Sequence, residues 1–375
     1  KSMIRQLIVV LLLLCSGCAG SGPIAQVRPD QLVFPELQFD FPVVEKSRLS
    51  NGMQLYLLED QELPLVEMTL MIAGGSIEDP ENRIGLSDLF AAGLESGGAG
   101  ELSAADLEAE LEAKAVKLSV SSETYHYQID LSTHKRDLPR VIEILASVLR
   151  RPRFEADRLE LARKQLQEAV LRRNDNPGAV AARLLSEAVF PQHRFGRSPQ
   201  LEGLALISRE DLLRVQQRCL LPNNILLAVS GDVDRDQLQS LLESQFGDWR
   251  PQPYQPFALP PLPAAPAGKI LLVDKEIPQT SIMLGHQGIS KDNPDMFALQ
   301  VANYILGGGG FNSRMMREIR SNRGLAYSVY SYFRIGRRLP ELFIAASETK
   351  CSSTVDVVSL MEELMQQLRD EPVTA

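Results

Sequence analysis

Histidine is scarce in this chain: the 375 residues include only His126, His134, His193 and His286. No two of them lie within five residues of each other, so the sequence lacks the local histidine pair that holds a metal from one helix face. An excess of basic residues is also lacking, because the formal net charge is −9. With no surplus of Lys and Arg to neutralise phosphates, nucleic acid is excluded as the main partner.

Long hydrophobic runs are missing too, and the one apolar stretch at the N-terminus is short. Residues 7–14 follow the positive residues Lys1 and Arg5 and fall far below the roughly 20 residues of a transmembrane helix. A charged start, a short apolar run and small residues predict a secretory signal over residues 1–18. Ser-Gly before Cys18 resembles a bacterial lipobox and predicts lipidation of Cys18, although a leucine usually stands where Cys15 does. A plain cleaved signal peptide is the alternative.

Irregular composition predicts a tether over residues 19–40, and seven prolines in residues 251–266 predict an extended linker over 251–267. The segments 41–250 and 268–375 share an order of strand, strand, helix, glycines, helix, strand and helix. This long internal repeat predicts two similar α+β domains. The second segment is the shorter, which suggests that its C-terminus is truncated.

Within these segments, hydrophobic periodicity predicts particular elements. Strict alternation over residues 123–132 predicts a half-buried strand, and KILLVD at 269–274 predicts the first strand of the second half. Helices are expected at about 138–149 and 155–173. The two remaining cysteines, Cys219 and Cys351, are too far apart in the chain for a disulfide framework and are expected to be buried or inert.

The common catalytic motifs are lacking as well. The chain has no GxSxG elbow and no GxxxxGK[ST] phosphate loop. The four glycines Gly307–Gly310 are not followed by Lys-Ser/Thr, so we interpret them as a backbone-accessible loop and not as a nucleotide site.

Three segments carry a family resemblance: LGGGGFNSRMMREIRSNRGLAYSVYSYF, DNPGAVAARLLSEAVFPQHRFGRSPQ and PNNILLAVSGDVD. Through them the chain after about residue 40 resembles the pitrilysin/insulinase-like zinc peptidases, which include the mitochondrial processing peptidase. The resemblance implies an α+β fold of two similar domains, each a mixed or antiparallel sheet packed by helices, that together form half of a clamshell around an unfolded peptide.

The resemblance also locates a zinc motif that this chain has lost. Active members carry His-x-x-Glu-His on one helix, where the two histidines bind zinc and the glutamate is the general base. The matching positions here are Ser87, Phe90 and Ala91, and the third ligand position falls at or beside Glu168. One carboxylate cannot hold zinc, so we expect no metal on this chain, Glu168 as a solvated residue, and an apolar, dry pocket at Phe90.

Histidines elsewhere could in principle replace the lost ligands. His126 falls on the polar face of a predicted strand and His193 in a loop, so both are interpreted as surface or packing residues. By contrast, the second half keeps Arg320 and Tyr327, the family pair that holds the substrate carbonyl. The alternative is a purely structural role for both residues, in which Arg320 caps the C-terminus of a helix and Tyr327 packs at a strand edge.

The leading hypothesis is therefore a non-catalytic, Arg/Tyr-bearing subunit of a heterodimeric zinc peptidase. A homologous partner with His-x-x-Glu-His would bind the zinc, and the pair would hold unfolded peptide in the periplasm, attached to the outer membrane by a lipid. A peptide-binding or assembly scaffold without proteolytic role is the alternative, with homodimer or heterodimer left open. An active metallopeptidase with rearranged ligands is the least favoured reading.

Overall fold

The computed structural model describes residues 38, 41–264, 268–371 and 373. The predicted signal peptide, with Cys18, and the predicted tether except Gln38 lie outside the described residues. By its internal contacts the chain from Val44 to Ala375 is one unit, and the following description concerns this unit. No helix in the described ranges combines the length and apolar character needed to cross a membrane.

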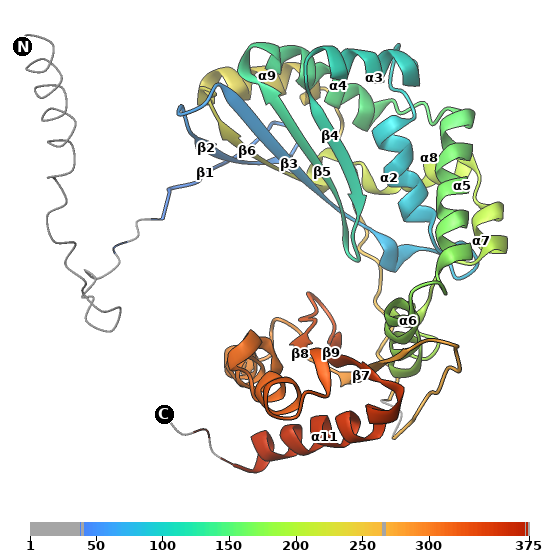
Figure 1. Cartoon of the computed structure of the whole chain (residues 1–375). Helices are drawn as coiled ribbons and strands as arrows, with labels where there is room; N and C mark the ends of the chain where they lie inside the picture. The colour runs from blue at the N-terminus through green and yellow to red at the C-terminus, as the bar shows by residue number, and fades with distance from the viewer. Residues whose placement is uncertain (1–37, 39–40, 265–267, 372, 374–375) are drawn as a thin grey trace, which may run out of the picture. The chain divides into compact units, whose positions relative to one another are not determined.

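The first half is built on a sheet of six strands (Figure 1). In spatial order these are β1 (Glu45–Arg48), β2 (Gln54–Glu59), β6 (Ile225–Gly231), β3 (Leu65–Ala73), β5 (His126–His134) and β4 (Lys117–Ser122). Only the β2–β6 pair is parallel. The sheet is mixed because β6 is inserted between β2 and β3, which are neighbours along the chain.

Helices cover one face of this sheet (Figure 1). The α-helices of the first half are α2 (Leu86–Ser96), α3 (Ala104–Ala113), α4 (Leu138–Arg150), α5 (Ala156–Arg172), α6 (Pro177–Val189), α7 (Leu201–Leu206), α8 (Arg209–Cys219) and α9 (Arg235–Phe246). Shorter 3₁₀ turns are η3 (Ser76–Glu78), η4 (Lys135–Asp137), η5 (Arg194–Gly196) and η6 (Pro222–Asn224). The predicted helices at 138–149 and 155–173 are confirmed as α4 and α5.

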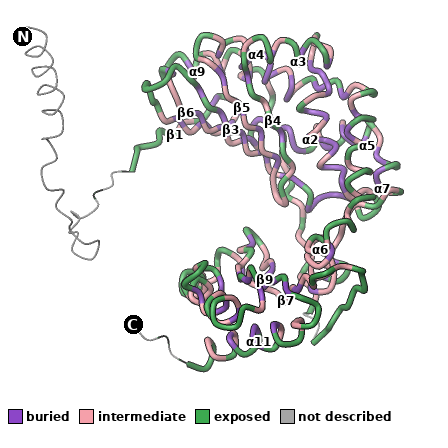
Figure 2. The backbone as a smooth tube through the Cα atoms, in the orientation of Figure 1, coloured by how far each residue is buried: buried purple, intermediate pink, exposed green. Residues whose placement is uncertain are grey.

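Alternation along β5 explains why the sheet has one covered face and one polar face. Tyr127, Ile129 and Leu131 are buried, whereas the residues between them are half-buried. Figure 2 shows the buried residues concentrated between the strands and the helices. Successive side chains of a strand point to opposite faces, so the apolar set lies under the helices and the polar set, with His126, faces away from them.

The second half contains a sheet of three antiparallel strands in the order β7 (Gln279–Gln287), β9 (Leu342–Lys350), β8 (Ala326–Phe333). Its helical segments are α10 (Met296–Asn303), the π-helical η7 (Tyr304–Gly308), the 3₁₀ turn η8 (Gly310–Asn312), the π-helical η9 (Met316–Asn322), the 3₁₀ turn η10 (Cys351–Ser353) and α11 (Thr354–Asp370). The fold is therefore α+β in both halves, with sheets packed by helices, as predicted.

The strand predicted at 269–274 is wrong, because these residues form no strand. Ile270 is 95% exposed and Leu272 is 88% exposed, although both are apolar. In the first half the matching strand β2 is held on its inner side by β6. The described part of the second half has no counterpart of β6, the strand with which β2 pairs in parallel.

The proline-rich segment is extended over its described residues 251–264, with no helix or strand. It is not detached from the rest of the chain. The Tyr254 hydroxyl donates to Glu78 Oε1 at 3.2 Å, the Arg194 guanidinium lies 4.3 Å from the centre of the Phe257 ring, and Gln287 donates to the Pro263 carbonyl at 2.7 Å. These contacts tie the segment to both halves.

The two described cysteines differ in environment. Cys219 is fully buried, and burial raises the pKa of its thiol to about 11, which keeps it unreactive as expected. Cys351 is exposed in the 3₁₀ turn after β9, so of the two alternatives, buried or inert, burial does not hold for it.

Candidate functional site

The positions of the lost zinc motif lie on α2 and belong to the core of the first half. Phe90 is 0% exposed, and Ser87 and Ala91 are also buried. The Phe90 ring lies 5.0 Å from the Tyr127 ring in an edge-on arrangement and 5.8 Å from the Phe154 ring. The surroundings are apolar as expected, but the Phe90 ring itself fills the space where a pocket was predicted. An aliphatic hydroxyl, a phenyl ring and a methyl group offer no ligand set for zinc.

The start of α2 is held by a carboxylate that sequence reasoning missed. The backbone N–H groups of Gly85 and Ser87 donate to Asp79 at 2.8 and 3.0 Å, and the Ser87 hydroxyl donates to Asp79 Oδ2 at 3.1 Å. Gly85 has φ of +99°, which permits the turn that aims these donors. Because Asp79 is buried, its pKa is raised to about 7 despite the three donors. The sequence offered only an acidic residue before a proline, which is a common turn pattern.

The third ligand position also fails to fit zinc. Glu168 is exposed on α5 and forms an ion pair with Arg172 one turn later, so its interpretation as a solvated residue is consistent with its environment. Across the described ranges, no group of three or more His, Cys, Asp or Glu side chains is arranged to hold a metal ion.

His126 and His193, considered above as replacements for the lost zinc ligands, do not lie in surroundings that hold a metal. His126 is half-buried on β5, and burial together with Arg337 lowers its pKa. His193 is buried at the start of η5, where its Nδ1 accepts a hydrogen bond from the Phe195 backbone at 3.2 Å. Its ring packs 4.7 Å from the Phe195 ring, so His193 acts as a turn cap and packing residue.

Arg320 and Tyr327 lie together on the second half. The Arg320 guanidinium carbon is 4.7 Å from the centre of the Tyr327 ring, and that ring is 80% exposed. Between them, Gly324 has φ of +62°, and its N–H donates to the Arg320 carbonyl at 3.0 Å. The left-handed residue closes η9 and turns the chain directly into β8, which brings Tyr327 back to Arg320.

Two irregularities in backbone geometry direct these side chains. Arg320 lies in the π-helical η9, a rare conformation that occurs frequently at functional sites. Tyr327 lies at a β-bulge, because Ala326 pairs with Thr349 while Ser328 pairs with the preceding residue of β9. A bulge re-aims a side chain relative to regular pleating.

The charge of Arg320 is free to face a ligand. The nearest acid along its helix, Glu318, accepts from Arg323 and Asn322, each at 2.8 Å. No ion pair of Arg320 with a carboxylate occurs in the part of the chain that the structure describes. A guanidinium and a phenolic hydroxyl are both donors that can bind a carbonyl oxygen or an oxyanion.

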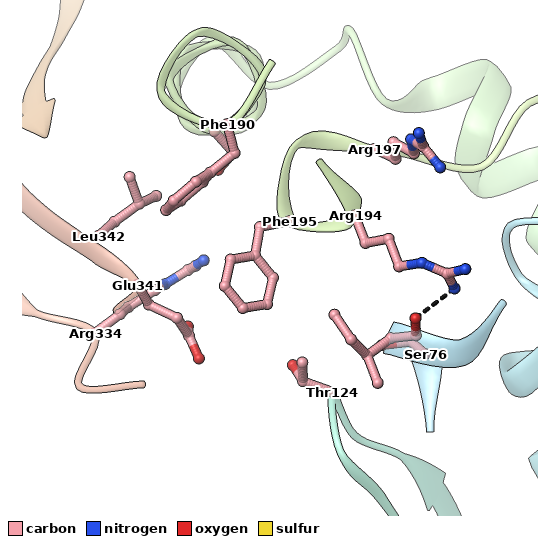
Figure 3. A pocket seen from close by; sticks show the side chains of 11 residues that line it. Ser76, Thr124, Phe190, Arg194, Phe195, Arg197, Arg334, Glu341 and Leu342 are labelled. Carbon is pink, nitrogen blue, oxygen red and sulfur yellow. Dashed lines mark hydrogen bonds between the residues drawn. The ribbon is translucent and has the colours of Figure 1, made fainter. Parts of the chain in front are cut away.

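A separate cavity of about 220 Å³ lies where elements of the two halves meet (Figure 3). Ser76 begins η3, Thr124 comes from the loop between β4 and β5, Phe195 comes from η5, and Arg334 and Glu341 come from the β8–β9 loop. Burial raises the pKa of Glu341, against the opposing effect of Arg334. The lining does not include Arg320 or Tyr327, so this cavity is distinct from the pair.

Comparison with known protein families assigns this chain to a family. A model of the insulinase family (peptidase family M16) matches residues 56–199, and a model described as the peptidase M16 inactive domain matches residues 206–375. The chain belongs to this insulinase-like family of peptidases and peptidase homologues. It spans about half the length of the first curated relatives that it matches.

Individual relatives are consistent with this assignment. An uncharacterized zinc protease of Mycobacterium bovis is 31% identical over 203 residues, which is 52% of this chain and 45% of that protein. The non-peptidase homolog YmxG of Helicobacter pylori is 26% identical over 84% of this chain and 73% of that protein. A crystal structure of a peptidase M16 inactive domain from Pseudomonas fluorescens matches with a TM-score of 0.80 at 24% identity, covering 88% of this chain and 80% of that one. The solved structure shows the shared fold, whereas the lost ligands, the inactive-domain model and the non-peptidase homolog together support a non-catalytic member of the family.

Proposed function

We propose that this chain is the non-catalytic subunit of a two-chain zinc peptidase, in which it holds unfolded peptide for a homologous partner. The partner would carry His-x-x-Glu-His and the zinc. The observation that carries the proposal is the contrast between the two halves. The zinc positions around Phe90 are filled by core side chains, whereas the Arg320 guanidinium lies against the exposed Tyr327 side chain and forms no ion pair with a described carboxylate.

The role of the pair follows from its chemistry. The Arg320 guanidinium would donate to the carbonyl oxygen of the bond to be cleaved, and the Tyr327 hydroxyl would donate to the same oxygen as negative charge develops on it. Donors already in place cost little reorganisation when the charge appears. Loss of one such donor lowers the rate about a hundredfold or more in other acyl-transfer sites.

The experiment is reconstitution with a homologue that carries the zinc motif, encoded in the same genome. We expect this chain alone to contain no stoichiometric zinc and to cleave no unfolded casein, and the mixed pair to cleave it. Arg320→Ala and Tyr327→Phe should each reduce kcat/KM of the pair by at least about tenfold. Cleavage of casein or stoichiometric zinc binding by this chain alone would refute the proposal.

Matched controls lie beside both residues. Arg323→Ala removes an arginine from the end of the same helix, and that arginine is already paired with Glu318. Tyr330→Phe removes a hydroxyl from another partly exposed tyrosine of β8. Both controls should leave kcat/KM unchanged. If the Arg320 and Tyr327 variants match these controls in an active pair, the chain is a scaffold and has no part in binding the reacting carbonyl.

The proposal includes a location in the bacterial cell envelope, as an outer-membrane lipoprotein facing the periplasm. Its support is the sequence around Cys18, which resembles a lipobox. When the full-length chain with its signal sequence is expressed, Cys18→Ser should shift the protein out of the outer-membrane fraction. The mass of the variant protein should lack the contribution of the lipid. If the variant has the same membrane fraction as wild type, and a mass that differs from it only by the substitution itself, Cys18 is not modified.

A further inference from the structure

Phe311 stands out among the residues that the proposed function does not use. Its ring is 68% exposed, and the Arg320 guanidinium carbon lies 4.8 Å from the centre of the ring. The distance is nearly the same as the 4.7 Å from Arg320 to the Tyr327 ring. Arg320 is therefore in contact with two aromatic rings that come from different segments of the chain.

We propose that Phe311 is a positioning residue that, together with the Tyr327 ring, fixes the direction of the Arg320 guanidinium. This inference rests on the proposed function for its consequence in catalysis, but not for its geometry. A guanidinium is attracted to the face of an aromatic ring by the ring quadrupole. Contact through its plane leaves the N–H groups at its edge free to donate.

The turn that carries Phe311 is rigidly built. Phe311 lies in η8, where the Ser313 hydroxyl donates to the Gly310 carbonyl at 2.8 Å and accepts from the Met316 backbone N–H at 3.3 Å. Ser313 is buried, and Gly310 has φ of +59°. These bonds fix the 3₁₀ turn, so the Phe311 ring is presented from a defined backbone.

The segment that leads into this turn, from the end of α10 through η7, is anchored to the strand that carries Tyr327. The Asn303 side chain donates to the Ser331 carbonyl at 3.1 Å and accepts from the Ser331 hydroxyl at 2.7 Å. Gly307 lies so close to β8 that a Cβ atom there would be 2.5 Å from the Ser331 nitrogen. The glycine loop and β8 are thus held at a fixed separation, and the two rings that contact Arg320 are held with them.

The arrangement explains how a half-buried arginine that forms no ion pair among the described residues could serve a geometric task. An arginine at a surface normally loses side-chain entropy when it must adopt one rotamer. Two ring contacts already restrict Arg320 before a ligand arrives, which lowers the cost of ordering it on binding. Without the Phe311 ring, Arg320 would retain its charge but sample more directions.

The first test measures the geometry alone. In the full chain with ¹⁵N-labelled arginine, the Nε–Hε group of Arg320 should show a ring-current shift and restricted motion. Phe311→Ala should reduce both, and Phe311→Tyr should restore them. The control Phe297→Ala, at another exposed phenylalanine of the same half, should change neither. An Arg320 signal that is the same in wild type and Phe311→Ala would overturn the inference.

The second test uses the reconstituted pair and fluorescein-labelled casein. Phe311→Ala should lower kcat by about two- to fivefold with a smaller change in KM, as expected for the loss of one exposed ring contact. Phe311→Tyr should restore kcat, whereas Phe311→Leu should not. If Phe311→Leu restores activity as well as Phe311→Tyr does, the side chain contacts the peptide directly and positioning is refuted. An inactive pair with an intact ring-current shift would refute the proposed function and leave the positioning role standing.

Discussion

The stability of the first half should depend on pH through Asp79, and the sign of this dependence follows from the structure. Asp79 is buried at the start of α2, and burial raises its pKa from 3.8 to about 7. Between these values the folded chain keeps a proton that the unfolded chain has released. The free energy of unfolding therefore falls as pH rises from about 4 to about 7, and it levels off above that range.

The magnitude follows from the size of the shift. A difference of about three pK units corresponds to about 4 kcal/mol at 1.36 kcal/mol per unit. Asp79→Asn removes the titration but keeps an oxygen that can accept from Gly85 or Ser87. We expect this variant to match wild type near pH 4 and to be more stable by up to about 4 kcal/mol near pH 8.

The assay exploits the fact that Trp249 is the only tryptophan. It follows α9 and stacks on Phe246 at 6.3 Å between ring centres, so its fluorescence reports unfolding of the first half. Urea unfolding near pH 4 and near pH 8 gives the two free energies. Asp234→Asn is the matched control, because Asp234 is an exposed cap of α9 and Asn caps a helix equally well. If Asp79→Asn is less stable than wild type near pH 8, the three donors outweigh burial and the reasoning is refuted.

Three further predictions concern the lost zinc site, the glycine loop and a helix cap. The triple variant Ser87→His, Phe90→Glu and Ala91→His should bind no stoichiometric zinc by metal analysis, because its new side chains replace core groups; it should unfold at urea concentrations below those of wild type. Stoichiometric zinc in a folded triple variant would contradict this. Gly307→Ala should lower the thermal midpoint, since its Cβ would overlap β8; an unchanged midpoint in calorimetry would show that the loop can move away. Ser208→Ala breaks the capping box of α8 and should cost about 1 kcal/mol in urea unfolding.

Local signals in the sequence located most elements of the first half. The alternation of Tyr127, Ile129 and Leu131 identified β5 and its buried face, and helical periodicity identified α4 and α5. These signals work because neighbouring residues on one element face a common environment. The segment 269–274 was assigned wrongly because its apolar residues have the composition of a strand, but pairing depends on an edge supplied by a distant segment.

The candidate site also has one part that the sequence predicted and one part that only the tertiary structure revealed. The family resemblance carried by the sequence identified the positions of the absent zinc ligands and pointed to Arg320 and Tyr327. Only the tertiary structure placed Asp79 under α2 and brought Phe311 against Arg320, because both contacts join residues whose sequence neighbours give no sign of them. Composition and periodicity determine which face of an element is buried. Bulges, π-helical segments and residues in the left-handed region determine the direction in which a particular side chain points. These irregularities depend on the packing of the whole fold.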